Sequence, residues 1–399
     1  MTMHLDAPAA PPRRPVFADA DVLDYRSALT PGERARLEEL TAVFRSEIAP
    51  VVGAHWTAGT FPHELLPVLA RLGLVGLTAD GGNALLHGFI HLELARVDTS
   101  ISTFLGVHSE LYANALAQLG SPEQQQRLLP AALELREVGA FALTEPEHGS
   151  DISRGMATSA RREGEGWVLD GVKRWIGNAP FADRLLVWAR DAQDGVIRGF
   201  LIPRTSPGVH VETIPDKIGL RIVQNGEIRL DGVRVAERDR LPGSAGFRDT
   251  GRLLAASRVW VAWQTAGLQF AAYDEALRYA QERHQFGRPL ASFQLIQDKL
   301  VRILDNATAT LGALVRVAQM QDAGELRPEH AALVKASGSA KMRESVALAR
   351  GIFGGNGILG SEHVARVFAD AEAVYSYEGS YEINTLIVGR GITGLSAFA

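Results

Sequence analysis

A single carboxylate near the C-terminal end of the sequence, Glu378, stands where a general base would be useful. It lies in the stretch Tyr377-Glu-Gly-Ser380, between an aromatic residue and a glycine. Gly379 permits a sharp turn of the backbone, and Ser380 is a good N-cap for a following helix. Apolar neighbours would raise the pKa of Glu378 and the helix N-terminus would lower it, which keeps a base near the working pH. These residues alone favour an acid that only serves the helix dipole, and the hypothesis of a proton-abstracting base depends on the rest of the chain.

The composition limits the possible classes of function. The chain has 399 residues, a net charge of -5 and no cysteine. The length predicts two or three domains. The mild negative charge gives no electrostatic argument for nucleic acid as a partner, and no apolar run is long enough to predict a membrane span. Without cysteine, disulfides, thiolate metal sites and a cysteine nucleophile are excluded, and we expect no metal site.

The first part of the chain predicts a leader followed by helices. Residues 1–20 are rich in proline and alanine and contain no apolar core, which predicts a disordered leader rather than a signal peptide. Over residues 21–138, apolar side chains recur at helical spacing and predict an N-terminal helical domain. Thr30 and Glu33 have the spacing of a reciprocal helix cap.

The middle and last parts predict strands and then helices again. Over residues 139–246, short apolar runs predict a small antiparallel barrel or sandwich of about six strands. Two Asp-Gly pairs, at Asp170 and Asp231, are typical of hairpin turns. Residues 247–399 predict a C-terminal four-helix bundle, in which Gly287 suits the end of the first helix. The expected class is a multidomain α+β protein, and a nicotinamide dehydrogenase is disfavoured because no glycine fingerprint follows a strand.

Five stretches, spread in order along the chain, resemble motifs of the acyl-CoA dehydrogenase and acyl-CoA oxidase superfamily. They are Phe141–Asp151, Lys173–Asn178, Arg283–Pro289, Gly354–Gly357 and Tyr377–Ser380. Each alone is a weak signal, but all five agree with the order of helices, strands and helices. Further stretches look closest to the glutaryl-CoA dehydrogenase and short-chain acyl-CoA oxidase branch, namely Asp216–Arg221, Leu295–Gln297 and Gly389–Gly394.

This resemblance implies the acyl-CoA dehydrogenase fold and FAD-dependent oxidation of an acyl-CoA thioester. Removing hydrogens from the α and β carbons needs a base for the α-proton and a flavin that takes the β-hydrogen as hydride. The resemblance makes Glu378 the base, flavin N5 the hydride acceptor and a trans-2-enoyl-CoA the product. Tyr377 and Gly379 would flank the thioester, whose carbonyl would meet the backbone N–H of Glu378 in an oxyanion-hole arrangement.

The resemblance also implies a set of FAD contacts. They are Phe141, Leu143, Thr144, Gly149, Ser150, Trp175, Ile176, Gly177, Arg283, Phe286, Gln294, Gly351, Gly354, Gly355 and Ser380. Trp175 to Gly177 are expected beside flavin N5. Arg283 is expected to reach the flavin pyrophosphate of a neighbouring subunit, in a homotetramer built as a dimer of dimers. From the residues alone, Thr144-Glu-Pro146 would be a turn and Arg283 a cation at a helix C-terminus.

Substrate contacts follow from the same resemblance. They are Ser150, Ser102, Thr103, Arg258, Tyr377 and Gly379. Ser102 stands where glutaryl-specific members have an arginine for the distal carboxylate. A buried site without that cation would leave a carboxylate unpaired, so we expect a short or branched neutral acyl group. The acidic companion that Arg258 usually has three residues earlier is replaced by Ala255.

Gly177 leaves the electron acceptor open. Most dehydrogenases of the superfamily have a threonine there that bonds to flavin N5, whereas the similar oxidases have glycine. The acceptor is therefore either an electron-transfer flavoprotein or O2, with H2O2 as the product in the second case. A carrier-protein thioester as substrate and a non-catalytic flavoprotein scaffold are further alternatives, and the presence of Glu378 argues against the scaffold. We expect a cytoplasmic location.

Overall fold

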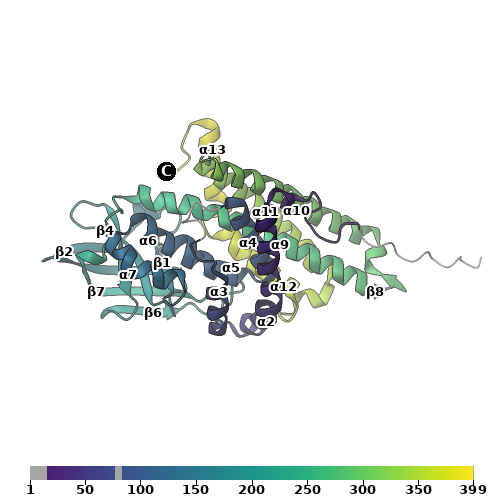
Figure 1. Cartoon of the computed structure of the whole chain (residues 1–399), viewed down its shortest axis with the longest axis horizontal. Helices are drawn as coiled ribbons and strands as arrows, with labels where there is room; N and C mark the ends of the chain where they lie inside the picture. The colour runs from purple at the N-terminus through teal and green to yellow at the C-terminus, as the bar shows by residue number, and fades with distance from the viewer. Residues whose placement is uncertain (1–15, 77–82, 399) are drawn as a thin grey trace, which may run out of the picture.

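The computed structural model describes residues 16–76 and 83–398 and contains three units in the predicted order (Figure 1). The N-terminal unit consists of helices η1 (Tyr25–Ala28), α1 (Pro31–Val43), η2 (Phe44–Ile48), α2 (Ala49–Ala58), η3 (His63–Leu65), α3 (Leu66–Leu72), α4 (Ala84–Val97), α5 (Thr99–Gly106), η4 (Val107–Ala113), α6 (Asn114–Leu119) and α7 (Pro122–Leu133). The predicted cap is confirmed, because Glu33 N donates to Thr30 Oγ1 and Thr30 N donates to Glu33 Oε2.

The predicted leader is only partly described. Residues 1–15 lie outside the described part of the chain. Within residues 16–20, Asp19 forms ion pairs with Arg26 at 3.2 Å and with Arg96 at 3.1 Å, and Ala20 is buried. The packed chain therefore begins before residue 21.

The middle unit is one curled sheet of seven strands. They are β1 (Gly139–Ala142), β2 (Ser159–Glu163), β3 (Gly166–Gly177), β4 (Arg184–Asp191), β5 (Ile197–Pro203), β6 (Val209–Thr213) and β7 (Asn225–Ala236), with the short helix α8 (Ile152–Gly155) before β2. Their order is β1-β4-β2-β3-β7-β6, and β5 pairs with β4. Antiparallel pairing is confirmed for most neighbours, but β1 and β2 run parallel to β4. The sheet is mixed because β4 lies between β1 and β2 and runs parallel to both. The chain reaches β4 by crossing over from β1 and again from the hairpin of β2 and β3.

The two Asp-Gly pairs are not hairpin turns, and that prediction is wrong. β3 continues through Asp170 and β7 continues through Asp231, and the two strands pair along their length. A register shift lies between Leu169 and Gly171, and Gly232 N donates to Asp170 Oδ1 at 2.7 Å. The same residue types that favour a tight turn here form a bulge between two long strands.

The C-terminal unit is a bundle of long helices. After η5 (Glu237–Asp239) it contains α9 (Phe247–Glu282), β8 (His284–Gln285), β9 (Arg288–Pro289), η6 (Leu290–Ser292), α10 (Gln294–Asp322), α11 (Pro328–Ile352), η7 (Gly354–Ile358), α12 (His363–Ser376) and α13 (Tyr381–Thr393). Gly287 does not end α9 as predicted. The helix ends earlier, at Glu282, and Gly287 supplies a positive φ of 76° in the turn between β8 and β9.

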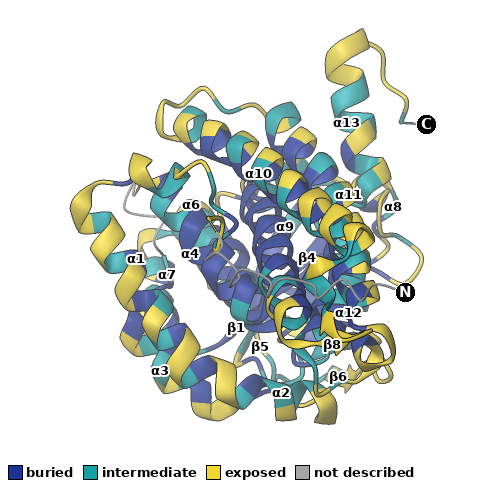
Figure 2. Cartoon of the chain, turned by 90° about the vertical axis from the view of Figure 1, so that its right-hand side faces the viewer, coloured by how far each residue is buried: buried dark blue, intermediate teal, exposed yellow. Residues whose placement is uncertain are grey.

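Helix α9 lies at the centre of the molecule and is dark blue over much of its length in Figure 2. Helix α4 packs against it closely, because a Cβ added to Gly88 would lie only 2.1 Å from Trp263 Cε2. None of the helices in the described part of the chain is long and apolar enough to cross a lipid bilayer.

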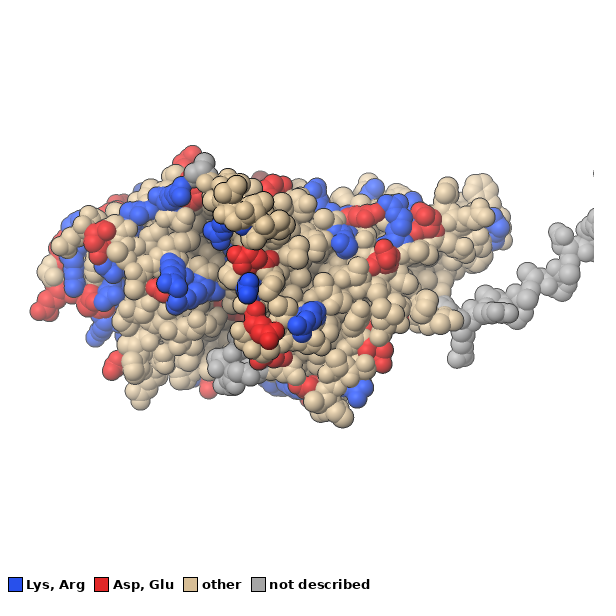
Figure 3. Space-filling model, turned by 90° about the horizontal axis from the view of Figure 1, so that it is seen from above, with Lys and Arg blue, Asp and Glu red and all other residues tan. Residues whose placement is uncertain are grey.

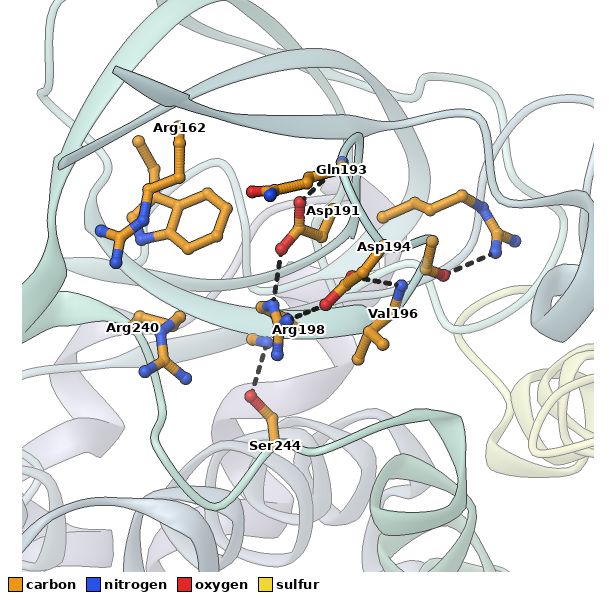
Figure 4. A network of polar contacts seen from close by, with 12 residues as sticks. Arg162, Asp191, Gln193, Asp194, Val196, Arg198, Arg240 and Ser244 are labelled. Atoms are coloured by element: carbon orange, nitrogen blue, oxygen red, sulfur yellow. Dashed lines mark hydrogen bonds and ion pairs between the residues drawn. The ribbon is translucent and has the colours of Figure 1, made fainter. Parts of the chain in front are cut away.

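The turn between β4 and β5 connects the sheet to the start of the C-terminal unit (Figure 4). Arg198 Nε donates to Asp191 Oδ2 at 2.9 Å, and Arg198 Nη2 donates to Asp194 Oδ2 at 2.5 Å. Gly199 N donates to the buried hydroxyl of Ser244 at 3.1 Å. These contacts fix the outer end of the sheet relative to the segment that leads into α9.

Two buried carboxyl groups lie where the three units meet. Asp370 of α12 accepts from Trp56 Nε1 at 2.9 Å and from Leu220 N at 2.7 Å, so it contacts all three units. Asp98 accepts from Ile101 N at 2.9 Å and caps α5. Burial, together with the charge of Asp370, raises the pKa of Asp98 to about 7. Burial raises the pKa of Asp370 to about 6.

The Asp98→Asn substitution tests this junction. The folded pKa of Asp98 lies above its ordinary value of 3.8, so the stability that it contributes is complete below that value and is lost as the pH rises through about 7. Asparagine keeps an acceptor for Ile101 N but does not ionise. We expect the thermal midpoint of the variant, measured by circular dichroism, to rise steadily relative to that of the wild type between about pH 4 and about pH 8.

The exposed Asp298 of α10 provides the matched control. Asp298→Asn removes one carboxyl group from the surface and so measures the effect of the change in net charge alone. A difference between Asp98→Asn and the wild type that stays constant with pH would contradict the assignment of a raised pKa to Asp98.

Candidate active site

Glu378 lies in the loop between α12 and α13 in a left-handed backbone conformation. Its φ is 55°, and the φ of the following Gly379 is 75°. Ser380 then begins α13 by accepting a hydrogen bond from Ile383 N at 3.3 Å, which confirms the predicted N-cap. A left-handed glutamate is strained, so the surrounding structure must hold it in place.

A buried lysine holds this loop. Lys335 of α11 is fully buried, and its Nζ donates to Tyr375 O at 3.0 Å and to Gly379 O at 2.9 Å. Asn384 Nδ2 donates to Gly379 O at 2.7 Å. The carbonyl groups on both sides of Glu378 therefore have fixed partners. Burial lowers the pKa of Lys335 to about 8.

The carboxylate of Glu378 is half-buried and has one hydrogen-bond donor and two cations nearby. Ser257 Oγ donates to Glu378 Oε2 at 2.6 Å. Burial raises the pKa of Glu378, while the Ser257 hydrogen bond and the charges of Arg258 and Lys335 act in the opposite direction. The net effect is a raised pKa in a group that positive neighbours can still hold ionised. These are the opposing influences expected of a general base.

A second group of polar side chains lies next to the base. The Tyr377 hydroxyl donates to Gln264 Oε1 and lies 3.2 Å from Thr103 Oγ1. Gln264 Nε2 donates to Ser102 Oγ at 2.9 Å and to Thr103 Oγ1 at 3.2 Å. The predicted substrate residues Ser102 and Thr103 thus lie in one buried network with Tyr377, and the described part of the chain places no cation in this network.

The predicted flavin segments of the sheet lie beside one another. Thr144, just after β1, accepts from Arg174 N at 2.8 Å, which places it beside β3, whereas Phe141 within β1 pairs with Leu186 of β4. A buried ion pair supports the same contact, because Lys173 Nζ donates to Glu145 Oε1 and to Leu143 O, each at 2.9 Å. Gly149 and Ser150 are exposed in the loop before α8.

The end of β3 has an open, apolar surface that fits a flat aromatic group. Trp175 has a positive φ of 63°, and 53% of its surface is exposed. Ile176 beside it is buried. A Cβ added to Gly177 would lie 3.2 Å from Val107 Cγ2, so Val107 packs against this glycine and a larger residue would have to displace it. The uncovered indole of Trp175 is a suitable surface for an isoalloxazine ring.

The remaining predicted cofactor residues lie elsewhere in the chain. Arg283 follows the last residue of α9, Phe286 is 92% exposed between β8 and β9, and Gln294 begins α10. Gly351 and Ile352 are the last two residues of α11, and Gly354 and Gly355 are the first two of η7. Cβ atoms added to Gly354 and Gly355 would meet nothing within 4 Å. Hairpin β8–β9 lies at one end of the molecule, whereas the sheet forms the other end (Figure 1). A single chain does not bring this group to the sheet.

Several residues of the site were missed by sequence reasoning. They are Ser257, Gln264, Lys335, Lys173 and Glu145, whose contacts are given above. Ser257 and Gln264 are seven residues apart, which is two turns of α9, so both face the same neighbours. That spacing beside Arg258 was an available signal. Lys335 gave none, because a lone lysine in a helical pattern normally indicates a solvated face.

The Ser257→Ala substitution tests the electrostatics of Glu378. The serine hydroxyl donates to the ionised carboxylate, so its removal raises the pKa of Glu378 further above the ordinary value. We expect the carboxyl band in infrared pH titrations to disappear at a higher pH in the variant. Glu378→Gln identifies the band, and Ser376→Ala, an exposed change on α12, is the matched control. An unchanged midpoint in Ser257→Ala would show that the hydrogen bond does not favour the charged form.

Comparisons with known proteins agree with this arrangement. The family models of the acyl-CoA dehydrogenase N-terminal, middle and C-terminal domains match residues 30–136, 140–233 and 244–393. The chain is similar to a solved glutaryl-CoA dehydrogenase from Mycobacterium smegmatis, with 36% identity and a TM-score of 0.92 over 96% of this chain and all of that one.

Two further matches span nearly the whole chain. A glutaryl-CoA dehydrogenase from the same organism, solved in complex with FADH2, is 30% identical, with a TM-score of 0.93 over 96% of this chain and all of that one. The mitochondrial short-chain specific acyl-CoA dehydrogenase of Rattus norvegicus is 30% identical over 91% of both chains. With three domain models matched in order over most of its length, the chain belongs to the acyl-CoA dehydrogenase family.

Proposed function

We propose that the chain catalyses FAD-dependent α,β-dehydrogenation of a short or branched acyl-CoA to the trans-2-enoyl-CoA, with Glu378 removing the α-proton. The observation that carries this proposal is the placement of Glu378, a carboxylate with a raised pKa beside Arg258 and Lys335. Ser257 binds Oε2, which leaves Oε1 to receive the proton. The backbone N–H of Glu378 is the proposed donor to the thioester carbonyl, with Tyr377 and Gly379 on either side.

The proposed FAD site begins at the end of β3. Trp175, Ile176 and Gly177 would lie beside the reactive edge of the ring, and the segment from Phe141 to Ser150 would hold it through backbone groups. The exposed indole of Trp175 supports this assignment. When bound, FAD supplies an acceptor for a hydride from the β carbon. The buried pair of Lys173 and Glu145 keeps the two segments together.

A homotetramer would complete that site. Arg283, Phe286, Gln294 and the glycines near η7 lie at the other end of the chain, so we assign them to the cofactor bound by a neighbouring copy. Large apolar side chains are exposed nearby, including Leu295 at 78% and Val301 at 64%. Seen from above, much of the surface over the long helices carries no Lys, Arg, Asp or Glu (Figure 3). Exposed apolar area of this kind supports an interface between copies. The predicted cytoplasmic location remains part of this proposal.

The proposed substrate is neutral because the network beside Tyr377 contains no cation in the described part of the chain. Ser102, Thr103 and Gln264 are uncharged and bonded to one another. A distal carboxylate placed there would lose its water without gaining a positive partner. A carrier-protein thioester could present the same acyl group, and turnover of free acyl-CoA distinguishes the two.

An acyl-CoA oxidase is the second candidate because of Gly177. Glycine has no hydroxyl that could bond to flavin N5, whereas most dehydrogenases of the superfamily have a threonine there and the similar oxidases have glycine. An added Cβ would lie 3.2 Å from Val107 Cγ2 and 3.7 Å from Val223 Cγ1, so these two valine side chains fill the space that a larger residue would need. An electron-transfer flavoprotein is the alternative acceptor, and peroxide release separates the two.

The Glu378→Gln substitution tests the base. Glutamine keeps the size of the side chain but cannot take the α-proton, so bleaching of the flavin by a saturated acyl-CoA should slow by about 10²–10⁴-fold. Anaerobic stopped-flow absorbance measures the rate, and a red shift of the flavin band on mixing reports binding. Glu382→Gln, an exposed change in the first turn of α13, should bleach as the wild type does. Normal bleaching by Glu378→Gln would assign the base elsewhere.

A substrate panel tests the neutral acyl group and the acceptor together. Butyryl-CoA and isobutyryl-CoA should be oxidised with a kcat/KM at least about 100-fold above that of glutaryl-CoA, because a carboxylate would be unpaired. Ser102→Arg should reduce the difference in kcat/KM between these neutral acyl-CoAs and glutaryl-CoA, because arginine supplies a cation for the carboxylate. Formation of H2O2 in air at the same rate as enoyl-CoA indicates an oxidase. Bleaching of the flavin that air does not reverse excludes an oxidase. Preference for glutaryl-CoA by the wild type would refute the neutral substrate.

A further inference from the structure

Three side chains capable of binding a metal ion face one another between α4 and η4. His87 and His91 lie one turn apart on α4, and Glu110 belongs to the π-helical segment η4. One ligand atom of each residue lies within 4.8 Å of the ligand atoms of the other two. His87 Nε2 and Glu110 Oε1 are 3.2 Å apart. π-Helical segments are rare and are often found at functional sites.

The donor set and its spacing suit a small divalent transition metal. Tetrahedral zinc binds nitrogen and oxygen ligands at about 2.0–2.2 Å, which places those ligand atoms roughly 3.4 Å from one another. The 3.2 Å between His87 Nε2 and Glu110 Oε1 is close to this value, and the ligand atom of His91 lies within 4.8 Å of both. Two imidazoles and one carboxylate, with water as a fourth ligand, form a set that zinc accepts.

The site also has outer partners and a route of entry. Ser102 Oγ lies 3.4 Å from His91 Nδ1, and Ser109 Oγ donates to Glu110 Oε1 at 2.9 Å. Hydrogen-bond partners of this kind usually fix the orientation of side chains that bind a metal. The His87 side chain is 12% exposed and that of Glu110 7%, whereas His91 is buried. An ion would therefore enter past His87.

We infer that His87, His91 and Glu110 form a binding site for a divalent metal ion of the zinc class, which joins α4 to η4. The site does not include Glu378, and it adjoins the network beside Tyr377 through the contact of His91 with Ser102. Binding displaces any proton held between His87 Nε2 and Glu110, because a coordinating nitrogen cannot keep one. The bound ion links two helices that the unfolded chain separates, so it stabilises the folded protein. This inference departs from the expectation of no metal site, because Glu110 is 23 residues from His87 in the sequence and meets it only through helix packing.

Calorimetric titration of the FAD-loaded full chain with zinc chloride, after dialysis against a chelator, tests the inference. We expect one zinc ion per chain and a higher thermal midpoint in its presence. His87→Gln should weaken binding at least about tenfold, since it removes a ligand. His210→Gln, an exposed change on β6, should bind as the wild type does. Neither readout depends on turnover, so the result is independent of the proposed function.

Glu110→Gln provides a second variant, because glutamine keeps the shape and an acceptor for Ser109 but loses the charge. It should also bind more weakly, and circular dichroism establishes that each variant is folded. The anomalous signal of a zinc-soaked crystal should place the ion between the three side chains. Absence of stoichiometric binding to the wild type, or equal affinity in the wild type and both folded variants, would overturn the inference.

Discussion

The buried ammonium group of Lys335 is the interaction on which the geometry of the loop depends. It binds the carbonyls of Tyr375 and Gly379, one on each side of Glu378, and thereby sets the separation of the two ends of the loop. With those ends fixed, Glu378 is held in the left-handed region that an isolated glutamate would rarely adopt. The same positive charge favours the ionised form of the Glu378 carboxylate. Lys335 therefore contributes both to the shape of the loop and, with Ser257 and Arg258, to the acidity of the base.

Helix α9 brings the other half of the site. Ser257 and Gln264 lie two turns apart on it, one bonded to Glu378 and the other to Tyr377. Their positions depend on the close packing of α4, which only a glycine at position 88 allows, because Trp263 fills the space that a side chain would need. A tightly packed helix has little freedom to rotate, so the two polar side chains keep their direction.

The sequence predicted what depends on local chemistry and on family motifs. The three units, the capping of α1 by Thr30 and the N-cap at Ser380 are all found, because each follows from residues close together in the chain. The turns at Asp170 and Asp231 were wrong, because an Asp-Gly pair serves a bulge as well as a hairpin and only the pairing of β3 with β7 decides between them. The roles of the cofactor and substrate residues stay predictions.

The partners of Glu378 could not be predicted, because they come from distant helices. Ser257 is 121 residues away in the sequence and Lys335 is 44 residues from Gly379. Neither belongs to a motif. A lysine at a helical position predicts a solvated face, and only the packing of α11 against the loop gives it two carbonyl acceptors. Long-range polar contacts of this kind are decided by tertiary structure and leave no trace in local patterns.

The network beside Tyr377 has a fixed direction. The tyrosine gives its proton to Gln264, whose amide gives its two protons to Ser102 and Thr103, and Thr103 gives its own to Thr99 O at 2.8 Å. From Tyr377 through Gln264 to Thr103, every proton is committed, so these groups present lone pairs alone to a molecule that approaches them. Such a surface repels an anion and bonds only to a group that brings its own proton. The network therefore selects a bound group by its hydrogen-bonding polarity as well as by its charge.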